Sequence, residues 1–131
     1  MSEPQAQGRK PQILIVDDSE DMRLLLEQIL EEEEYTLLFA EDGLSAIEQA
    51  KTYLPDLMLM DMSLPGMSGW EVVRRLRQRS EFAQTPIIAV TAHVSKSDQE
   101  RALEIGCNAH LGKPFDVVTV IETIERFLQA D

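Results

Sequence analysis

Short apolar segments alternate with amphipathic ones along most of the chain. Five of the apolar segments are predicted to be strands buried on both faces, because they are short and lack strict alternation of apolar and polar residues. They span residues 13–16, 35–40, 57–60, 87–90 and 109–111. The strands therefore recur at a spacing that leaves room for a helix after each one.

Apolar residues between these segments recur at helical spacing. Ser19 precedes the first such stripe as a candidate N-cap, and Glu20 and Asp21 suit the positive end of a helix. The remaining stripes lie around residues 44–54, 70–76, 102–105 and 117–128. Five strand–helix units in a row predict an α/β domain over residues 12–131, with an open parallel sheet and helices on both faces. Residues 1–11 are polar, and we expect a flexible N-terminal arm.

The charge of the chain limits its partners. Twelve Lys and Arg against 24 Asp and Glu give a net charge of −12. This balance argues against binding to nucleic acid or to an anionic membrane, and it suits basic protein surfaces or divalent cations. The acidic run at residues 31–34 is expected to be a solvated helix end. A single cysteine, no signal peptide and no long apolar run favour a cytoplasmic location.

Polar residues stand where four of the predicted strands end. Asp17 and Asp18 follow the first strand, Asp61 the third, Thr91 the fourth and Lys113 the fifth. Because ligands of such sheets bind at the carboxyl ends of the strands, we expect these side chains to share one crevice.

The expected crevice has the chemistry of a phosphoryl-transfer site. Three carboxylates in one place repel one another, and a divalent cation relieves that repulsion. Oxygen ligands without His or Cys favour Mg²⁺. A lysine and a threonine hydroxyl nearby suit an anionic phosphoryl group, and a carboxylate can itself be the nucleophile, which gives an aspartyl phosphate.

These residues lie in motifs that resemble the receiver domains of two-component response regulators, including chemotaxis regulators and single-domain regulators. The motifs are Ile-Leu-Ile-Val-Asp17-Asp18-Ser, Leu-Met-Leu-Met-Asp61-Met-Ser-Leu-Pro-Gly-Met-Ser-Gly, Ile-Ile-Ala-Val-Thr91-Ala and Lys113-Pro-Phe. The resemblance covers residues 12 to about 128 and implies a doubly wound, five-stranded parallel sheet of flavodoxin-like strand order 2-1-3-4-5 with five helices.

The resemblance also implies a role for each site residue. Asp61 would accept the phosphoryl group. Asp18, Asp61 and the backbone carbonyl of Ser63 would bind Mg²⁺ directly, with Asp17 acting through water. Lys113 would pair with Asp61 and then contact the phosphoryl group, and its bond to the following proline would be cis.

Thr91 would move to hydrogen-bond the phosphoryl group and report it. The position that often holds a switching Tyr or Phe is His110, which we expect could also switch. Ser63 and His93 stand where family members tune dephosphorylation.

The implied function is a stand-alone response regulator, not an enzyme with turnover. It would receive its phosphoryl group from a histidine kinase or a phosphotransfer protein. It would signal by protein contact through the fourth helix, fifth strand and fifth helix, by a homodimer formed there, or by onward relay. One alternative is a degenerate receiver that acts only as an interaction module. The other is a haloacid-dehalogenase-type phosphatase, which needs an Asp where Ser63 stands.

Overall fold

The computed structural model describes residues 9–92 and 95–128. Within these residues, five strands and five α-helices alternate, and a short 3-10 helix lies between the third α-helix and the fourth strand. The strands are β1 (Gln12–Val16), β2 (Thr36–Ala40), β3 (Leu57–Asp61), β4 (Ile87–Thr91) and β5 (Ala109–Gly112). The helices are α1 (Glu20–Leu30), α2 (Gly43–Tyr53), α3 (Gly69–Arg77), η2 (Ser80–Phe82), α4 (Lys96–Ile105) and α5 (Val117–Leu128).

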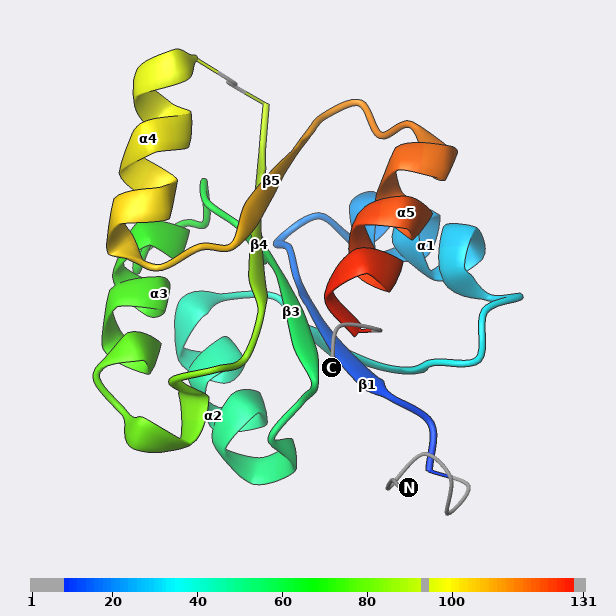
Figure 1. The fold of residues 1–131 in the computed structure, drawn as a ribbon, viewed down its shortest axis with the longest axis horizontal. Coiled ribbons are helices and arrows are strands. Elements are labelled where there is room, and N and C mark those ends of the chain that lie inside the picture. Colours follow the sequence, from blue (N-terminus) through cyan, green and yellow to red (C-terminus); the bar gives the residue numbers. More distant parts are fainter. Residues whose placement is uncertain (1–8, 93–94, 129–131) are drawn as a thin grey trace.

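All strand pairs are parallel, and the sheet order is β2-β1-β3-β4-β5. Helices α2, α3 and α4 cover one face of the sheet, and α1 and α5 cover the other (Figure 1). The chain reverses its direction of winding between β1 and β3, so the loops after these two strands meet at one edge of the sheet. Both the fold class and the strand order match the predictions.

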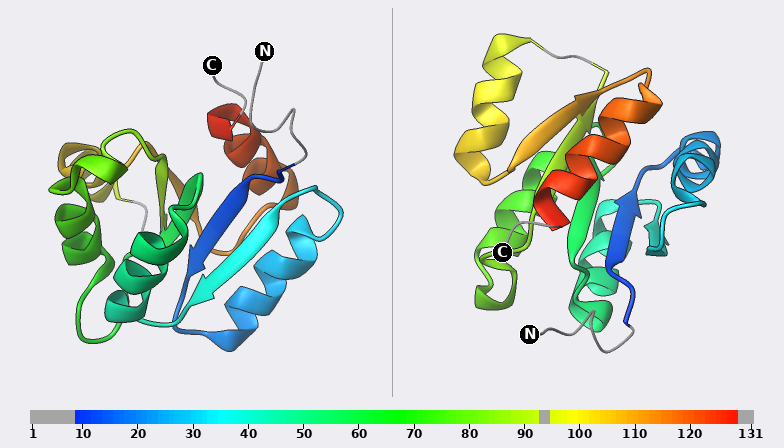
Figure 2. Two further views of the ribbon diagram at one scale, coloured as in Figure 1. Left: turned by 90° about the horizontal axis from the view of Figure 1, so that it is seen from below. Right: turned by 45° about the vertical axis from the view of Figure 1, so that its right-hand side comes forward.

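Each face of the sheet has its own apolar core, because successive strand residues point to opposite sides. Leu14, Met58 and Met60 face α2, α3 and α4. Ile13, Ile15 and Leu59 face α1 and α5. The side views in Figure 2 show the sheet between the two helical layers. Burial on both faces explains why the strands lack alternation in the sequence.

Helix boundaries follow local capping. Ser19 accepts a hydrogen bond from the Met22 N–H and begins α1, as predicted. Helix α4 begins at Lys96, six residues before the apolar residues that signalled it, because Ser95 caps its polar first turns. The short η2 helix was not predicted. No helix in the described part of the chain is long and apolar enough to span a membrane.

Helix α4 has little apolar anchorage, since Ala102 is its one fully buried residue. Its C-terminal end is instead held by Arg77 of α3. The Arg77 guanidinium donates to the Gly106 carbonyl (2.8 and 3.1 Å), to the Phe82 carbonyl and to the Asn108 side-chain oxygen (3.0 Å). A positive side chain at the negative end of a helix is favourable, so Arg77 fixes this end of α4.

Of the predicted arm, residues 1–8 lie outside the described residues. Arg9 pairs with Asp56 at 3.2 Å, and the Asp56 carboxylate also accepts the Gln12 N–H at 2.7 Å. Residues 9–12 therefore run along the amino-terminal edge of the sheet, away from the predicted crevice.

Candidate functional site

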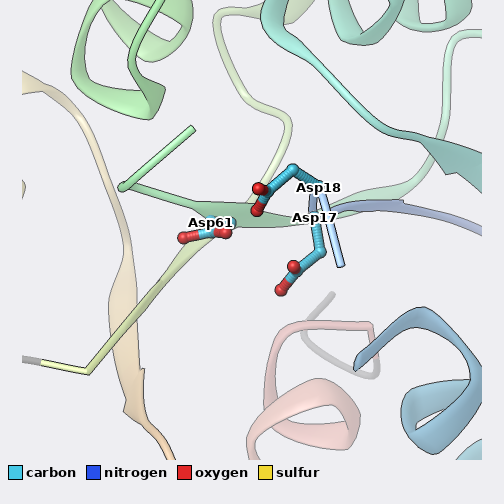
Figure 3. Close-up of side chains that lie close together, drawn as sticks. All are labelled: Asp17, Asp18 and Asp61. Atoms are coloured by element: carbon cyan, nitrogen blue, oxygen red, sulfur yellow. The ribbon is translucent and has the colours of Figure 1, made fainter. Parts of the chain in front are cut away.

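Three carboxylates meet at the carboxyl ends of β1 and β3. Asp17 and Asp18 directly follow β1, and Asp61 is the last residue of β3. One oxygen from each lies within 4.8 Å of the others. Figure 3 shows the three side chains gathered at the place where these two strands end. The predicted convergence of Asp17, Asp18 and Asp61 is present in the structure.

Asp61 is almost fully buried, with 3% of its surface exposed. Its Oδ1 atom accepts the Ser63 N–H at 2.9 Å, which fixes the orientation of the carboxylate. Gly69 lies directly behind it: a Cβ at that position would come within 2.3 Å of the Asp61 carbonyl oxygen and 2.6 Å of the Met62 Cα. Only glycine lets the start of α3 approach the Asp61 backbone this closely.

Asp17 is also buried, and both of its oxygens have partners. Oδ1 accepts the Ser19 N–H at 2.9 Å, and Oδ2 lies 3.1 Å from the Lys113 Nζ atom. Arg23 donates to the Asp17 carbonyl at 2.7 Å and so ties α1 to this turn. Asp18 is exposed. Asp18 therefore has more freedom than Asp17 to bind a further ligand.

Lys113 brings its ammonium group next to the buried carboxylates of Asp17 and Asp61. Its Nζ lies 3.7 Å from Asp61 Oδ2, so it contacts both buried carboxylates and is nearer to Asp17 than to Asp61. The Lys113–Pro114 bond is cis, as the resemblance implied. The Lys113 N–H donates to the Thr91 carbonyl at 3.0 Å, which joins the ends of β5 and β4 beside the cluster.

The surroundings of Asp61 disfavour its charged form. Burial raises the pKa of Asp61 above its usual 3.8, and the charges of Asp17 and Asp18 raise it further. The Ser63 hydrogen bond and the Lys113 charge oppose this shift of the pKa without cancelling it. Carboxylate oxygens are hard ligands, and one oxygen from each of the three carboxylates lies within 4.8 Å of the others, which suits a partly hydrated divalent cation such as Mg²⁺.

Thr91 is the last residue of β4, and His110 lies on β5 in register with Ala89 of β4. Both line a small, almost wholly apolar pocket between the sheet, α3 and α4, together with Met62, Trp70, Ala89, Asp98, Gln99 and Ala102. Arg101 of α4 stacks on Trp70 of α3, with its guanidinium 4.0 Å from the ring centroid. His110 itself is exposed. The pocket therefore lies between Thr91 and α4, next to a histidine that faces outward.

The remaining predicted positions divide in two groups. Ser63 is exposed directly after the cluster, and its N–H is already used by Asp61. His93 lies outside the described residues. Sequence reasoning missed Arg23 and the close approach of Gly69. For Gly69, the sequence shows only that a glycine stands eight residues after Asp61, where an amphipathic helix is predicted to begin. Nothing in the sequence pointed to Arg23.

Comparison with known proteins agrees with this geometry. Residues 13–125 match the family model of the response regulator receiver domain. The chain is 40% identical over 116 residues to the polar-differentiation response regulator DivK of Brucella anthropi, a match that covers 88% of this chain and 94% of DivK.

Solved structures show the same fold. The chemotaxis protein CheY4 of Vibrio cholerae superposes with a TM-score of 0.87 at 30% identity, covering 92% of this chain and all of CheY4. The receiver domain of a Pseudomonas aeruginosa sensor histidine kinase superposes with a TM-score of 0.85 at 30% identity, covering 93% of this chain and all of that domain. That domain holds a magnesium ion in its active-site cleft. The chain with the Asp17, Asp18 and Asp61 cluster belongs to the response regulator receiver domain family.

Proposed function

We propose that this receiver domain accepts a phosphoryl group on Asp61 and signals through the resulting change of its surface. The observation that carries the proposal is the position of Asp61: a buried carboxylate at the end of β3, oriented by Ser63, with two further carboxylates and Lys113 around it. A degenerate receiver would lack part of this set.

Asp18, Asp61 and the Ser63 backbone carbonyl would hold Mg²⁺, with Asp17 contributing through water. Support comes from the hard oxygen ligands within 4.8 Å and from the two partners that already occupy Asp17. When bound, the ion supplies positive charge to the phosphoryl oxygens and removes the repulsion among the carboxylates.

In the proposed transfer, an Asp61 oxygen attacks the phosphorus of a phosphohistidine on the donor protein. The new P–O bond forms as the P–N bond breaks, and the imidazole leaves with the electron pair and takes up a proton. Lys113 is close enough to move from the carboxylates to a phosphoryl oxygen. Such a reaction depends mainly on positioning and charge neutralisation, which this site provides.

Thr91 would hydrogen-bond the new phosphoryl group, and His110 would respond as the switch. Both residues border the same apolar pocket against α4, so a shift of Thr91 changes the packing of α4. The output would then be read on α4, β5 and α5 by a target protein or a second copy. Leu103 of α4 is 59% exposed, which suits a protein partner at this surface.

The donor would be a histidine kinase or a histidine phosphotransfer protein, and the reaction would be a single acceptance followed by self-dephosphorylation. A stoichiometric experiment separates this function from phosphatase activity. The domain is incubated with Mg²⁺ and acetyl phosphate, and the phosphate bound per chain is counted. In a parallel incubation with Mg²⁺ and a phosphate monoester, the phosphate released is counted. We expect a measurable acid-stable, base-labile label that does not exceed one phosphate per chain, and no turnover of the ester. Steady turnover of such esters would support the phosphatase, and no label at all would support the degenerate receiver.

A further inference from the structure

Arginine residues concentrate on α3 in a chain that is otherwise strongly acidic. Residues 69–79 contain four arginines and one acidic residue, Glu71, which gives this segment a net charge of +3. The whole chain carries −12, so the other residues together carry −15. Residues 69–79 therefore carry a charge opposite in sign to that of the rest of the chain, which suits a different class of partner.

Three of these arginines line a groove between α2 and α3, two helices that lie side by side on one face of the sheet (Figure 1). The side chains of Arg74, Arg75 and Arg79 are 54%, 52% and 44% exposed. The fourth, Arg77, turns toward Gly106 and is used within the fold. We call the surface formed by Ile47, Arg74, Arg75, Leu76, Gln78 and Arg79 the α2–α3 groove.

The positive charge along the groove is only partly neutralised. One carboxylate oxygen of Glu71 accepts from both Arg74 (Nη2) and Arg75 (Nε, 2.8 Å), so a single negative charge serves two guanidinium groups. These hydrogen bonds lower the pKa of Glu71 to about 2, which keeps it charged at neutral pH and holds both arginines in place. Arg79 pairs with Glu81 at 2.9 Å. Three guanidinium groups thus face two carboxylates.

The floor of the groove is apolar. Leu76 of α3 is fully buried and Ile47 of α2 is half-buried, so Ile47 supplies the apolar surface that a partner can reach in the groove. Leu44 stands one turn before Ile47 on α2 and is 65% exposed. Lys51 stands one turn after Ile47 and adds a further exposed cation to α2. An apolar floor with a cationic rim calls for a partner that offers both apolar side chains and carboxylates.

We propose that the α2–α3 groove binds an acidic amphipathic helix of a partner protein. The apolar stripe of such a helix would cover Leu44 and Ile47, and its flanking Asp and Glu residues would meet the guanidinium forks of Arg74 and Arg75. A nucleic acid would make no use of the apolar floor, which is why we favour a helix that offers apolar side chains as well as carboxylates.

This surface is separate from the site of phosphorylation and from the proposed output surface. The groove belongs to α2 and α3, whereas the output surface belongs to α4, β5 and α5. A helix bound in the groove leaves both free, so the receiver domain holds one protein at α2–α3 while it exchanges another at α4, β5 and α5. The inference does not depend on the proposed phosphoryl acceptance.

The test uses a fluorescein-labelled synthetic peptide of about 18 residues, with Leu at helical spacing and Glu elsewhere. Its scrambled isomer is the peptide control. Binding to the whole chain is measured by fluorescence anisotropy, and the contact surface is mapped by amide chemical shifts. Arg74→Gln combined with Arg75→Gln removes two groove cations. Arg9→Gln combined with Lys10→Gln makes the same change of net charge outside the groove, just before β1. Leu44→Gln removes an exposed apolar contact without changing charge.

We expect the amphipathic peptide to bind and to shift amides of α2 and α3. The Arg74/Arg75 double variant should weaken binding roughly tenfold or more, and Leu44→Gln should also weaken it, while the Arg9/Lys10 double variant stays within about twofold. Equal binding of the scrambled peptide, unchanged binding by the Arg74/Arg75 variant, or shifts centred on α4 and α5 would overturn the proposal. So would unchanged binding by Leu44→Gln, which would reveal a general anion site.

Discussion

Replacing Asp61 by asparagine should make the metal-free protein more stable, because the acidic cluster is an electrostatic cost to the fold. Asparagine keeps the oxygen that accepts the Ser63 N–H and removes the charge. The reference variant is Asp21→Asn, which changes the net charge equally at an exposed residue in the first turn of α1. The difference between the two variants therefore reports the net cost of burying a charged Asp61 beside Asp17, Asp18 and Lys113.

The magnitude follows from the distances. The carboxylate oxygens lie within 4.8 Å of one another, and at an effective dielectric constant of about 20 two charges at that limit repel by about 3.5 kcal/mol. Asp17 supplies this repulsion to Asp61, and exposed Asp18 supplies about half as much after screening by solvent. The Lys113 ammonium, 3.7 Å from Asp61 Oδ2, stabilises the Asp61 carboxylate by about 4.5 kcal/mol at the same dielectric constant of about 20. With the cost of burying the carboxylate added, we expect Asp61→Asn to stabilise the fold by about 1–2 kcal/mol.

For a domain of this size, that gain corresponds to a Tm increase of roughly 3–10 °C. Scanning calorimetry in EDTA at neutral pH should show this increase for Asp61→Asn, and little change for Asp21→Asn. Millimolar Mg²⁺ should raise the Tm of the unmodified protein and remove most of the advantage of Asp61→Asn.

The effect should also depend on pH with a defined sign. Because the pKa of Asp61 is raised in the folded state, the folded protein holds this proton more tightly than the unfolded chain. Stability is therefore lost as the pH rises from the usual 3.8 through the raised value, and the loss is complete above it. The Tm advantage of Asp61→Asn should vanish in acid. A variant that is no more stable than the unmodified protein in EDTA would refute the proposed balance of charges.

Three further substitutions test other parts of the structure. Asp18→Asn should weaken Mg²⁺ binding on the order of tenfold or more in a calorimetric titration, while Asp21→Asn should not, and equal affinities would argue against the proposed ligand set. Gly69→Ala should destabilise the fold by about 2–3 kcal/mol in urea, because its Cβ meets the Asp61 and Met62 backbone, and an unchanged midpoint would contradict that contact. Arg77→Met should lower the free energy of unfolding by roughly 2–4 kcal/mol and speed amide hydrogen exchange at the C-terminal end of α4. Arg75→Met, at an exposed position, should do neither. Equal exchange rates in the two variants would rule out the role given to Arg77.

The convergence of Asp17, Asp18, Asp61 and Lys113 was predictable because it depends only on topology. Parallel strands end at the same edge of a sheet, so residues that follow apolar runs meet there, however far apart they stand in the sequence. The pairing of Lys113 was not predictable in the same way. Whether its ammonium lies nearer to Asp17 or to Asp61 depends on side-chain conformation at distances of 3.1 and 3.7 Å.

Contacts between distant helices were also beyond reach of the sequence. Arg77 is one of four arginines in α3 and its flank, and nothing in the pattern distinguishes it from exposed Arg75, yet it bonds to Gly106, which is 29 residues away. The exposure of His110 also depends on the arrangement of the fold. Strand β5 lies at the edge of the sheet, where a polar residue is tolerated on a partly open face.

Mapping the phosphoryl group by mass spectrometry tests the central proposal most directly. The protein is treated with acetyl phosphate and Mg²⁺, the acyl phosphate is reduced with borohydride, and the digested peptides are sequenced. The proposal predicts that Asp61 alone is converted to homoserine, that EDTA abolishes the conversion, and that Asp21→Asn leaves it intact. Conversion at Asp17, Asp18 or any other carboxylate with Asp61 unmodified would contradict it.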